Sequence, residues 1–200
     1  MPEISPPPGR RERNKQAKLD RIVAAAGELF SEYGVDDVTT QQIADKADIG
    51  AGTLFLYAKS KGELLLMVQN SSYADSLTRG MAAAQEIPET LGAVMAIVSE
   101  VVYCNRKQVD NGRTYLREMV FGDPEEPHRR QALDLAQQTE DAIAVVLQRD
   151  QHIDPGHATT IPRIVSAIML LSMASAANLA AGTEEIIYSI RGQIAAILPR

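Results

Sequence analysis

Residues 39–61, TTQQIADKADIGAGTLFLYAKSK, hold the side chains with the clearest capacity for chemistry in this chain. The segment begins with hydroxyl and carboxamide groups and ends with the ammonium groups of Lys59 and Lys61. These groups donate hydrogen bonds or carry positive charge, so they suit contacts with phosphate oxygens. Lys61 would open a helix, where the helix dipole favours a bound phosphate, although an isolated surface lysine is often only solvated.

Bond-making chemistry has little support in the sequence. The three histidines, His128, His152 and His157, form no recognisable constellation with a serine, a cysteine or a carboxylate. His152, Asp154 and His157 have the ligand chemistry for a metal ion, but the Pro-Gly pair between them favours an exposed turn. We therefore predict no enzyme, no metal site and no cofactor.

Two short helices must position the polar groups of residues 39–61. A threonine at position 39 or 40 can cap the first helix, and Gln42 completes a capping box with Thr39. Asp48 stands where the turn between the helices needs a positive φ, which aspartate tolerates better than most side chains. The second helix is expected to begin near Gly50.

Apolar residues place the second helix on the first. Ile43 and Ala47 form the inward stripe of the first helix, and Leu54 and Tyr57 of the second helix would pack against them. The small side chain of Ala44 allows the two helices to approach closely. This packing leaves the following residues on or near the exposed side: Ala51, Gly52, Thr53, Phe55 and Leu56.

Two helices that cross at a short turn are the arrangement that places a second helix in the DNA major groove. Residues 20–64, DRIVAAAGELFSEYGVDDVTTQQIADKADIGAGTLFLYAKSKGELL, resemble the TetR family of transcriptional regulators, with the motif spacing kept without an insertion. The resemblance implies an all-α fold, in which a three-helix DNA-binding domain precedes a helical ligand-binding and dimerisation domain. It also implies contacts with a double-stranded DNA operator from Thr39, Thr40, Gln41, Ala51, Gly52, Thr53, Phe55, Leu56, Tyr57, Lys59 and Lys61.

The second helix departs from the family pattern. Phe55, Ala58 and Lys59 stand where the family commonly has tyrosine, phenylalanine and proline. Residues 50–58, GAGTLFLYA, contain no arginine, lysine, asparagine or glutamine, so the usual bidentate base readers are absent. Base readout would rely on Thr53, on apolar contacts with thymine methyl groups, on backbone amides or on DNA shape.

Charge is distributed unevenly along the chain. The net charge is −6, which argues against a protein that coats nucleic acid. Residues 10–21 hold six basic and two acidic side chains, a net charge of +4, whereas residues 68–200 hold 11 basic and 16 acidic side chains. The basic segment is either a solvated helix start or an arm that reaches phosphates or the adjacent minor groove.

The chain is predicted to divide into a flexible basic and Pro-rich tail (1–14), a helix-turn-helix domain (15–60) and a ligand-binding and dimerisation domain (61–200). Helical periodicity outside residues 39–58 predicts helices at 15–33, 61–85, 89–108, 114–121, 128–150, 160–181 and 183–198. Asn111-Gly112 predicts a turn, and residues 151–160 predict a loop.

The resemblance implies a ligand pocket among the middle helices. Methionines offer adaptable apolar walls, and tyrosine or cysteine side chains offer polar anchors. The candidates are Met67, Tyr73, Met95, Tyr103, Cys104, Tyr115 and Met119. A mostly apolar pocket would take a hydrophobic or amphipathic small-molecule effector.

The last two helices are expected to form a homodimer. Small side chains make the penultimate helix suitable for close packing, and isoleucines at 186, 187, 190, 194 and 197 give the last helix a wide apolar face. Both faces could instead belong to the core of a monomer. A helix-turn-helix reader needs a dimer to span two half-sites about 34 Å apart.

One cysteine and the lack of a signal peptide predict a cytoplasmic protein. The apolar run 164–181 has nearly the length of a membrane span, but its serines and alanines favour a buried helix, so no membrane contact is predicted. We expect a DNA-binding transcriptional regulator, a repressor released from its operator by the effector. The alternative is a helical ligand-binding or sequestering protein whose DNA-binding head is not used.

Overall fold

The computed structural model describes residues 9–199 and is all-helical over that range, which confirms the predicted fold class. The helices are α1 (Arg10–Tyr33), α2 (Thr40–Lys46), α3 (Ala51–Leu54), α4 (Lys61–Gln85), α5 (Thr90–Arg106), α6 (Val109–Phe121), α7 (Pro127–Leu147), α8 (Pro155–Ala174), the 3-10 helix η1 (Ala176–Asn178) and α9 (Thr183–Ile197). The bounds of α4 are those predicted. Its start is fixed by Ser60, which accepts a hydrogen bond from the Glu63 amide.

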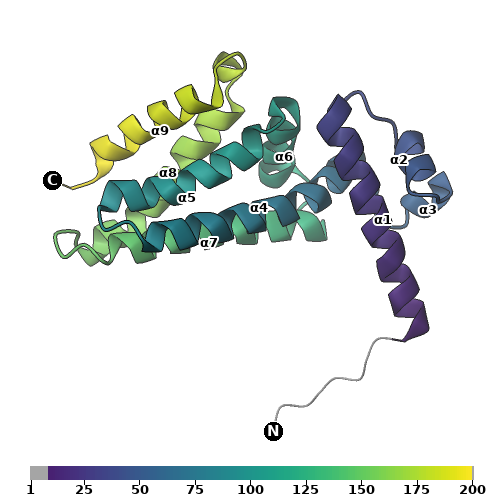
Figure 1. Cartoon of the computed structure of the whole chain (residues 1–200), viewed down its shortest axis with the longest axis horizontal. Coiled ribbons are helices and arrows are strands. Elements are labelled where there is room, and N and C mark those ends of the chain that lie inside the picture. The colour runs from purple at the N-terminus through teal and green to yellow at the C-terminus, as the bar shows by residue number, and fades with distance from the viewer. Residues whose placement is uncertain (1–8, 200) are drawn as a thin grey trace, which may run out of the picture.

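The molecule has a small head at one end of an elongated body (Figure 1). The head consists of α1, α2 and α3, and α4 runs from the head along the body. In the body, α4 packs against α5, α6 and α7, while α8 packs against α7, α9 and α6. The head therefore connects to the body through the start of α4 and the contacts around it.

The buried side chains form one continuous apolar cluster from the head into the body. Ile22, Phe30, Ile43 and Leu54 join the three head helices, each with at most 1% of its surface exposed. The body core is built mainly of aliphatic side chains from α4, α5, α7 and α8. Apolar burial at these periodic positions is what fixes the helices to one another.

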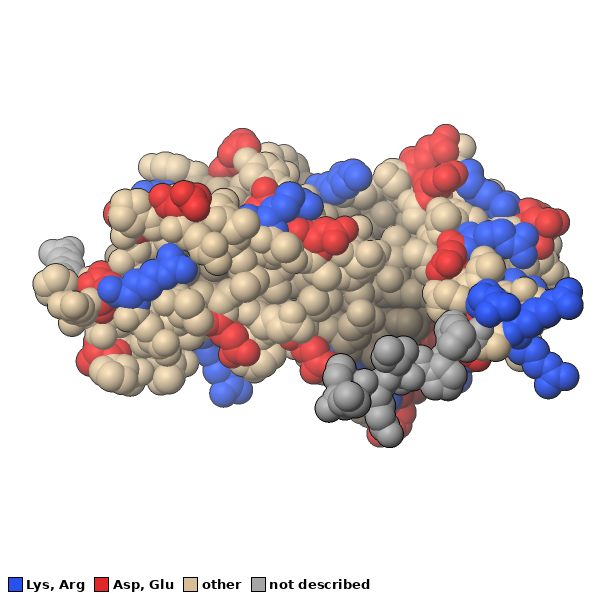
Figure 2. Space-filling view, turned by 60° about the horizontal axis from the view of Figure 1, so that its bottom comes forward, with Lys and Arg blue, Asp and Glu red and all other residues tan. Residues whose placement is uncertain are grey.

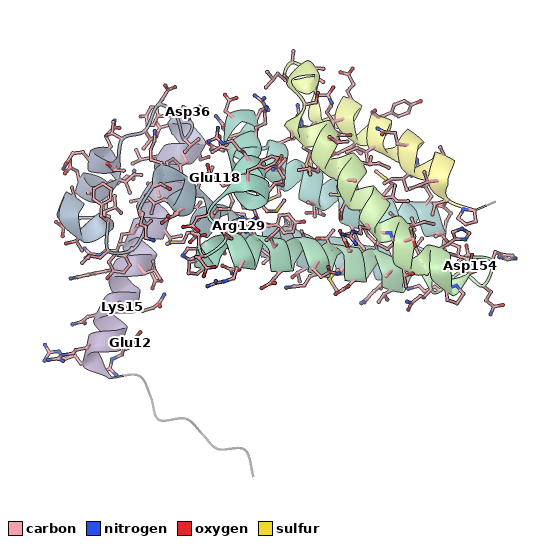
Figure 3. The ribbon with its side chains drawn as sticks, turned by 180° about the vertical axis from the view of Figure 1, so that it is seen from behind. Glu12, Lys15, Asp36, Glu118, Arg129 and Asp154 are labelled. Carbon is pink, nitrogen blue, oxygen red and sulfur yellow. The ribbon has the colours of Figure 1, made fainter. Side chains whose placement is uncertain are left out.

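Helix α1 begins earlier than predicted. It starts at Arg10, so residues 10–14 of the predicted tail are helical, while residues 1–8 of that tail lie outside the described residues. Residues 10–18 are all exposed, and Figure 3 shows Glu12 and Lys15 on the part of α1 that projects beyond the rest of the head. No packing stripe marks these turns, which is why periodicity alone placed the helix start at residue 15.

Helix α6 also begins earlier than predicted, and the predicted turn at Asn111-Gly112 is wrong. Both residues lie inside α6, whose first turn is capped by Gln108. A Cβ at Gly112 would lie 2.1 Å from the carbonyl oxygen of Asn105. Glycine is therefore required there for the close approach of α6 to the end of α5, and not for a turn.

Helix α8 is displaced toward the N-terminus relative to the predicted range of 160–181. It begins at Pro155, because the Asp154 side chain caps it by accepting hydrogen bonds from the amides of Gly156 and His157. Figure 3 shows Asp154 at the end of the body far from the head. Most of the predicted loop at 151–160 is consequently helical.

Two arginines explain why α8 ends at Ala174 and not at residue 181. Arg113 Nε donates a hydrogen bond to the Ala174 carbonyl oxygen (3.2 Å). Arg106 is 6% exposed, and its guanidinium group donates to the carbonyl oxygens of Asn178 (3.2 Å) and Ala181 (2.7 Å). The bond from Arg113 satisfies the Ala174 carbonyl group, which a helix to residue 181 would have paired with the Asn178 amide. The bonds from Arg106 satisfy carbonyl groups of the segment that follows α8.

Among the described helices, α8 is the one long and apolar enough to cross a membrane by length and composition. Its most apolar stretch is 39% buried within this chain. The core helix of a soluble protein meets the same criteria, so this finding is weak evidence for a membrane span.

Candidate DNA-binding head and effector cavity

The predicted capping box opens α2. Thr39 Oγ1 accepts a hydrogen bond from the Gln42 amide (3.2 Å), and Gln42 Oε1 accepts one from the Thr39 amide (2.8 Å). Two main-chain donors at the start of α2 are thereby satisfied. Gln41, a predicted DNA contact, is exposed and donates to Asp45 Oδ1 (2.7 Å) on the same helix.

The turn between α2 and α3 has the predicted geometry. Asp48 has φ 53°, and it is the only non-glycine residue with positive φ among the described residues. The Ile49 amide donates to the Ala44 carbonyl oxygen (3.0 Å), which closes the turn. Arg21 of α1 lies 3.5 Å from the Asp48 carboxylate, an exposed ion pair that adds little stability.

Helix α3 is a single turn, shorter than the predicted second helix, which is expected from the sequence to begin near Gly50 and to include Leu54 and Tyr57. Hydrogen-bonded turns continue it, because the Leu56 and Ala58 amides donate to the carbonyl oxygens of Thr53 and Leu54, both at 3.1 Å. Leu54 is fully buried and anchors this segment to the head core.

The exposed face of this segment is apolar. Phe55 is 50% exposed and Leu56 is 83% exposed, while Gly52 is also exposed. Ala51, Thr53 and Tyr57 are half-buried, and Tyr57 packs against the core as predicted. The face can therefore make apolar and backbone contacts, but it carries no charge.

The two candidate lysines differ in their surroundings. Lys61 Nζ donates hydrogen bonds to the carbonyl oxygens of Val35 (2.8 Å) and Asp36 (3.0 Å), in the loop between α1 and α2. The Lys59 side chain is exposed. The ammonium group of Lys61 already has two protein partners, so Lys59 is the better candidate for a phosphate contact.

Positive charge gathers on one face of the first turns of α1. At about 100° per residue, the basic face spans an arc of about 140°, and it comprises Arg10, Arg11, Lys15, Lys18 and Arg21. Glu12 and Asp20 lie outside this arc. Figure 2 shows Lys and Arg side chains gathered at the head end of the molecule. Since Arg21 pairs with Asp48, the basic face continues toward the helix-turn-helix.

The body contains a cavity of about 280 Å³ between α4, α5, α6, α7 and α8. Its wall is mostly apolar, with Val101, Leu116, Met119, Met169, Leu170 and Met173 among the lining residues. Polar groups come from Asn105, Thr139, Glu140 and Arg163. Apolar walls with a few polar groups are typical of small-molecule sites.

The structure divides the candidate pocket residues among three locations. Tyr73 and Met119 line the body cavity. Tyr103 and Cys104 line a separate groove of about 530 Å³ between α1, α4 and α5. Met67, Met95 and Tyr115 are buried and line none of the cavities described here; they belong to the core or its hydrogen-bond network.

Tyr73 and Tyr115 connect the cavity to α4, α6 and α7. Their rings stack with centroids 6.4 Å apart. The Tyr73 hydroxyl group forms a hydrogen bond with Thr139 Oγ1 (2.9 Å), and the Tyr115 hydroxyl group donates to Asn70 Oδ1 (2.9 Å). Burial raises the pKa of Tyr73 to about 12 and also raises the pKa of Tyr115, so both act as neutral hydrogen-bonding groups.

Apart from Tyr73, the polar residues named above for the cavity were missed from the sequence. Thr139 could have been found, because it lies at helical spacing between the inward positions Leu135 and Ile143 of α7. Arg163 and Glu140 carried no such signal. The histidines His152 and His157 pair with Asp150 and Asp154, and no group of three possible metal ligands occurs among residues 9–199.

Comparison with known proteins places these features in context. The model of a family described as bacterial regulatory proteins, tetR family, matches residues 22–68. No protein of curated function matches the chain significantly.

Solved structures share the whole fold. A TetR transcriptional regulator from Rhodococcus sp. RHA1 is 16% identical, with a TM-score of 0.68 over 92% of this chain and 97% of that chain. FadR from Bacillus subtilis, solved with stearoyl-CoA, is 13% identical, with a TM-score of 0.65 over 90% of this chain and 100% of that chain. AibR, solved with isovaleryl coenzyme A and operator DNA, is 15% identical, with a TM-score of 0.59 over 88% of this chain and 97% of that chain.

Proposed function

We propose, from the match of residues 22–68 to the tetR family of bacterial regulatory proteins and from the shared fold, that the chain is a dimeric, sequence-specific DNA-binding transcriptional regulator. The proposed sign is repression, relieved when a small hydrophobic or amphipathic ligand binds the body. The observation that carries the proposal is the helix-turn-helix itself. Its capping box, its positive-φ turn and the exposed face of α3 are the parts that a major-groove reader requires.

The two DNA-contacting parts have different proposed roles. Thr53, Phe55 and Leu56 would read base edges through hydrogen bonds and apolar contacts with thymine methyl groups. Lys59 and the basic face of α1 would contact phosphates. A helical extension with five cations compensates for the lack of charge on α3.

A homodimer through α8 and α9 is supported by an apolar face left uncovered in the single chain. On α8 this face includes Ile164, Ala167 and Leu171, and on α9 it includes Tyr188, which is 80% exposed. The predicted isoleucine face of α9 is mostly used elsewhere, because residues 186, 190 and 194 are buried within the chain. Pairing would set the distance between the two copies of α3 to that of successive major grooves.

The proposed effector occupies the body cavity. FadR binds stearoyl-CoA and AibR binds isovaleryl coenzyme A in their solved structures, which makes acyl-CoA thioesters the first class to test. The apolar wall suits an acyl chain, and Arg163 offers a cation for an acidic group. Ligand and DNA are coupled only if the ligand binds the two arrangements of the heads with different affinities.

The second candidate function is a ligand-binding or sequestering protein that does not use its head. The uncharged face of α3 and the internal bonds of Lys61 favour this reading. Salt dependence separates the two functions, since operator binding through phosphates weakens steeply with salt.

Selection of genomic DNA fragments by the purified protein at moderate salt tests the proposal. We expect enrichment of a short pseudo-palindrome, with an affinity that falls as salt rises. The matched control is the double variant Phe55→Ser, Leu56→Ser, which keeps the buried Leu54 and should enrich nothing. If the natural chain enriches no fragment, the regulator function is refuted and sequestration takes its place.

A further inference from the structure

The loop between α1 and α2 is held by a side chain from the body. The Val35 amide donates to Asn111 Oδ1 (2.7 Å), and Asn111 Nδ2 donates to the Phe30 carbonyl oxygen (2.7 Å). Phe30 and Val35 belong to the head, whereas Asn111 lies in the first turn of α6. The Asn111 carboxamide group thus binds two main-chain groups that lie 81 residues (Phe30) and 76 residues (Val35) away in the sequence.

The chemistry of this contact requires a carboxamide. Asn111 is 4% exposed, and its donor and its acceptor each meet a main-chain group of the opposite kind. A carboxylate could accept from Val35 but could not donate to Phe30, and an aliphatic side chain could do neither. Loss of the first bond leaves the Val35 amide without its partner. Loss of the second removes one of two bonds to the Phe30 carbonyl oxygen, which also accepts from the Gly34 amide (3.0 Å).

Lys61 also binds the loop between α1 and α2, but it connects the loop to α4 and not to α6. Its ammonium group binds the Val35 and Asp36 carbonyl oxygens from the first residue of α4, the helix that follows the head directly. Asn111 instead connects the loop to α6 (Figure 3, where Asp36 and Glu118 mark the loop and α6). The head is therefore attached to the body at two separate helices.

Helix α6 is also a wall of the body cavity. Leu116 and Met119 line the cavity, and Tyr115 stacks on the lining residue Tyr73. Asn111 and Tyr115 are one helical turn apart. A displacement of α6 caused by occupancy of the cavity would move the Asn111 carboxamide relative to Phe30 and Val35 without passing through α4.

We propose that Asn111 is a positioning residue for DNA binding, which fixes the head on the body through the Phe30 and Val35 main chain and couples it to α6. Its effect on DNA rests on the proposed function, whereas its hold on the loop does not. Asn111 touches no DNA and acts only through the orientation of the head.

The variant Asn111→Asp provides a reversible test. The ionised carboxylate loses the donor to Phe30 O, whereas the protonated acid restores it with almost the same shape. Burial and the neighbouring carboxylates of Asp36 and Asp110 raise the pKa of the introduced carboxyl group, whereas the Lys61 ammonium group, which binds the same loop, lowers it. Measurements across pH 5 to 8, each relative to the natural chain at the same pH, cancel the titration of other groups.

Asn70→Asp is the matched control. Asn70 is also buried, 1% exposed, but its side chain bonds only body groups: the His128 carbonyl oxygen, Gln131 and Tyr115. Asn111→Leu completes the set, because it removes both bonds at every pH.

Two readouts are measured on the full chain. Hydrogen exchange of the Val35 amide reports how firmly the loop is held. The ionised carboxylate of Asn111→Asp can still accept from Val35, but its second oxygen would face the Phe30 carbonyl oxygen, and this repulsion displaces the side chain. We therefore expect exchange to accelerate on the order of tenfold in Asn111→Asp at pH 8 and to recover toward pH 5. Affinity for a duplex recovered in the genomic selection should fall and recover over the same pH range. Asn111→Leu should lose both the protection of the Val35 amide and the DNA affinity, without recovery at low pH. In Asn70→Asp, Val35 exchange and DNA affinity should change no more than the loss of global stability accounts for.

Three outcomes would overturn the proposal. Unchanged Val35 exchange in Asn111→Leu, which removes both bonds, would show that Asn111 does not hold the loop. If Val35 exchange is faster in Asn111→Asp but its DNA affinity equals that of Asn70→Asp, the role of Asn111 is structural only. If Val35 protection and DNA affinity recover at low pH in Asn111→Leu, the pH dependence does not come from the side chain at position 111. If the natural chain binds no duplex, the proposed function fails by itself, and the exchange measurement still decides whether Asn111 holds the head.

Discussion

The exposed face of α3 and the first turns of α1 are both available for DNA, yet they have opposite chemistry. The segment 50–58 that contains α3 carries no charged side chain, whereas residues 10–21 carry a net charge of +4. In many DNA-binding helices one surface supplies both base contacts and phosphate contacts. Here the two are separated, so that sequence preference and salt-dependent affinity should respond to different substitutions.

Neutralising the basic face of α1 has the largest expected effect. In the variant Arg10→Gln, Arg11→Gln, Lys15→Gln, Lys18→Gln, affinity for all duplexes should fall on the order of a hundredfold, and the salt slope should decrease by up to about 3.6. Preference among sequences should not change. Titration of labelled duplexes from 50 to 300 mM salt measures both quantities.

The same four substitutions leave the folded head intact, since residues 10–18 are exposed. A salt slope equal to that of the natural chain would show that α1 does not contact phosphates, and the separation of roles would be lost.

Truncating the apolar face of α3 should remove sequence preference. Phe55→Ala and Leu56→Ala should each reduce discrimination between the selected duplex and a scrambled one by about 1–3 kcal/mol, because apolar contacts with thymine methyl groups are lost. The salt slope should stay as in the natural chain. Val145→Ala, an exposed apolar position on α7 in the body, is the control. A changed slope with unchanged discrimination would reverse the assigned roles.

Lys61→Met should lower stability more than it lowers salt dependence. Two hydrogen bonds to the α1–α2 loop are lost, at a cost of about 1 kcal/mol because the side chain is partly solvated. Thermal or urea unfolding measures this cost. An unfolding free energy equal to that of the natural chain, with a reduced salt slope, would return Lys61 to the phosphate-contacting set.

Lys59→Met is expected to have the smallest effect and the opposite pattern. The Lys59 side chain is exposed, so stability should change by less than about 0.5 kcal/mol, whereas the salt slope should decrease by about 1. Comparison with Lys61→Met in the same titration decides which lysine contacts the DNA backbone.

Local signals explain why part of the molecule could be predicted from the sequence. Thr39, Gln42 and Asp48 fix the helix-turn-helix through bonds and a φ angle within a few residues of each other. Ser60 does the same for the start of α4. Such features depend on adjacent residues, so no tertiary information is needed to see them.

The remaining features depend on contacts between distant residues. Asn111 and Gly112 have the composition of a turn, but Asn105, Phe30 and Val35 pack them into a helix. The end of α8 is set by arginines from α5 and α6, and the cavity by five helices. Periodicity could identify an inward residue, but not whether it faces a cavity or another side chain, as the buried Met67 and Met95 show.

Arg113 gives α6 a third connection. It lies two residues after Asn111 and binds the last carbonyl group of α8, the helix with the apolar face proposed for pairing. A helix that holds both the head of its own subunit and the border of the proposed twofold interface is placed to transmit a change between subunits. Effector binding to one subunit would then change the effector affinity of the other subunit, which gives a Hill coefficient above one for the effector. The two heads would leave DNA in a concerted step.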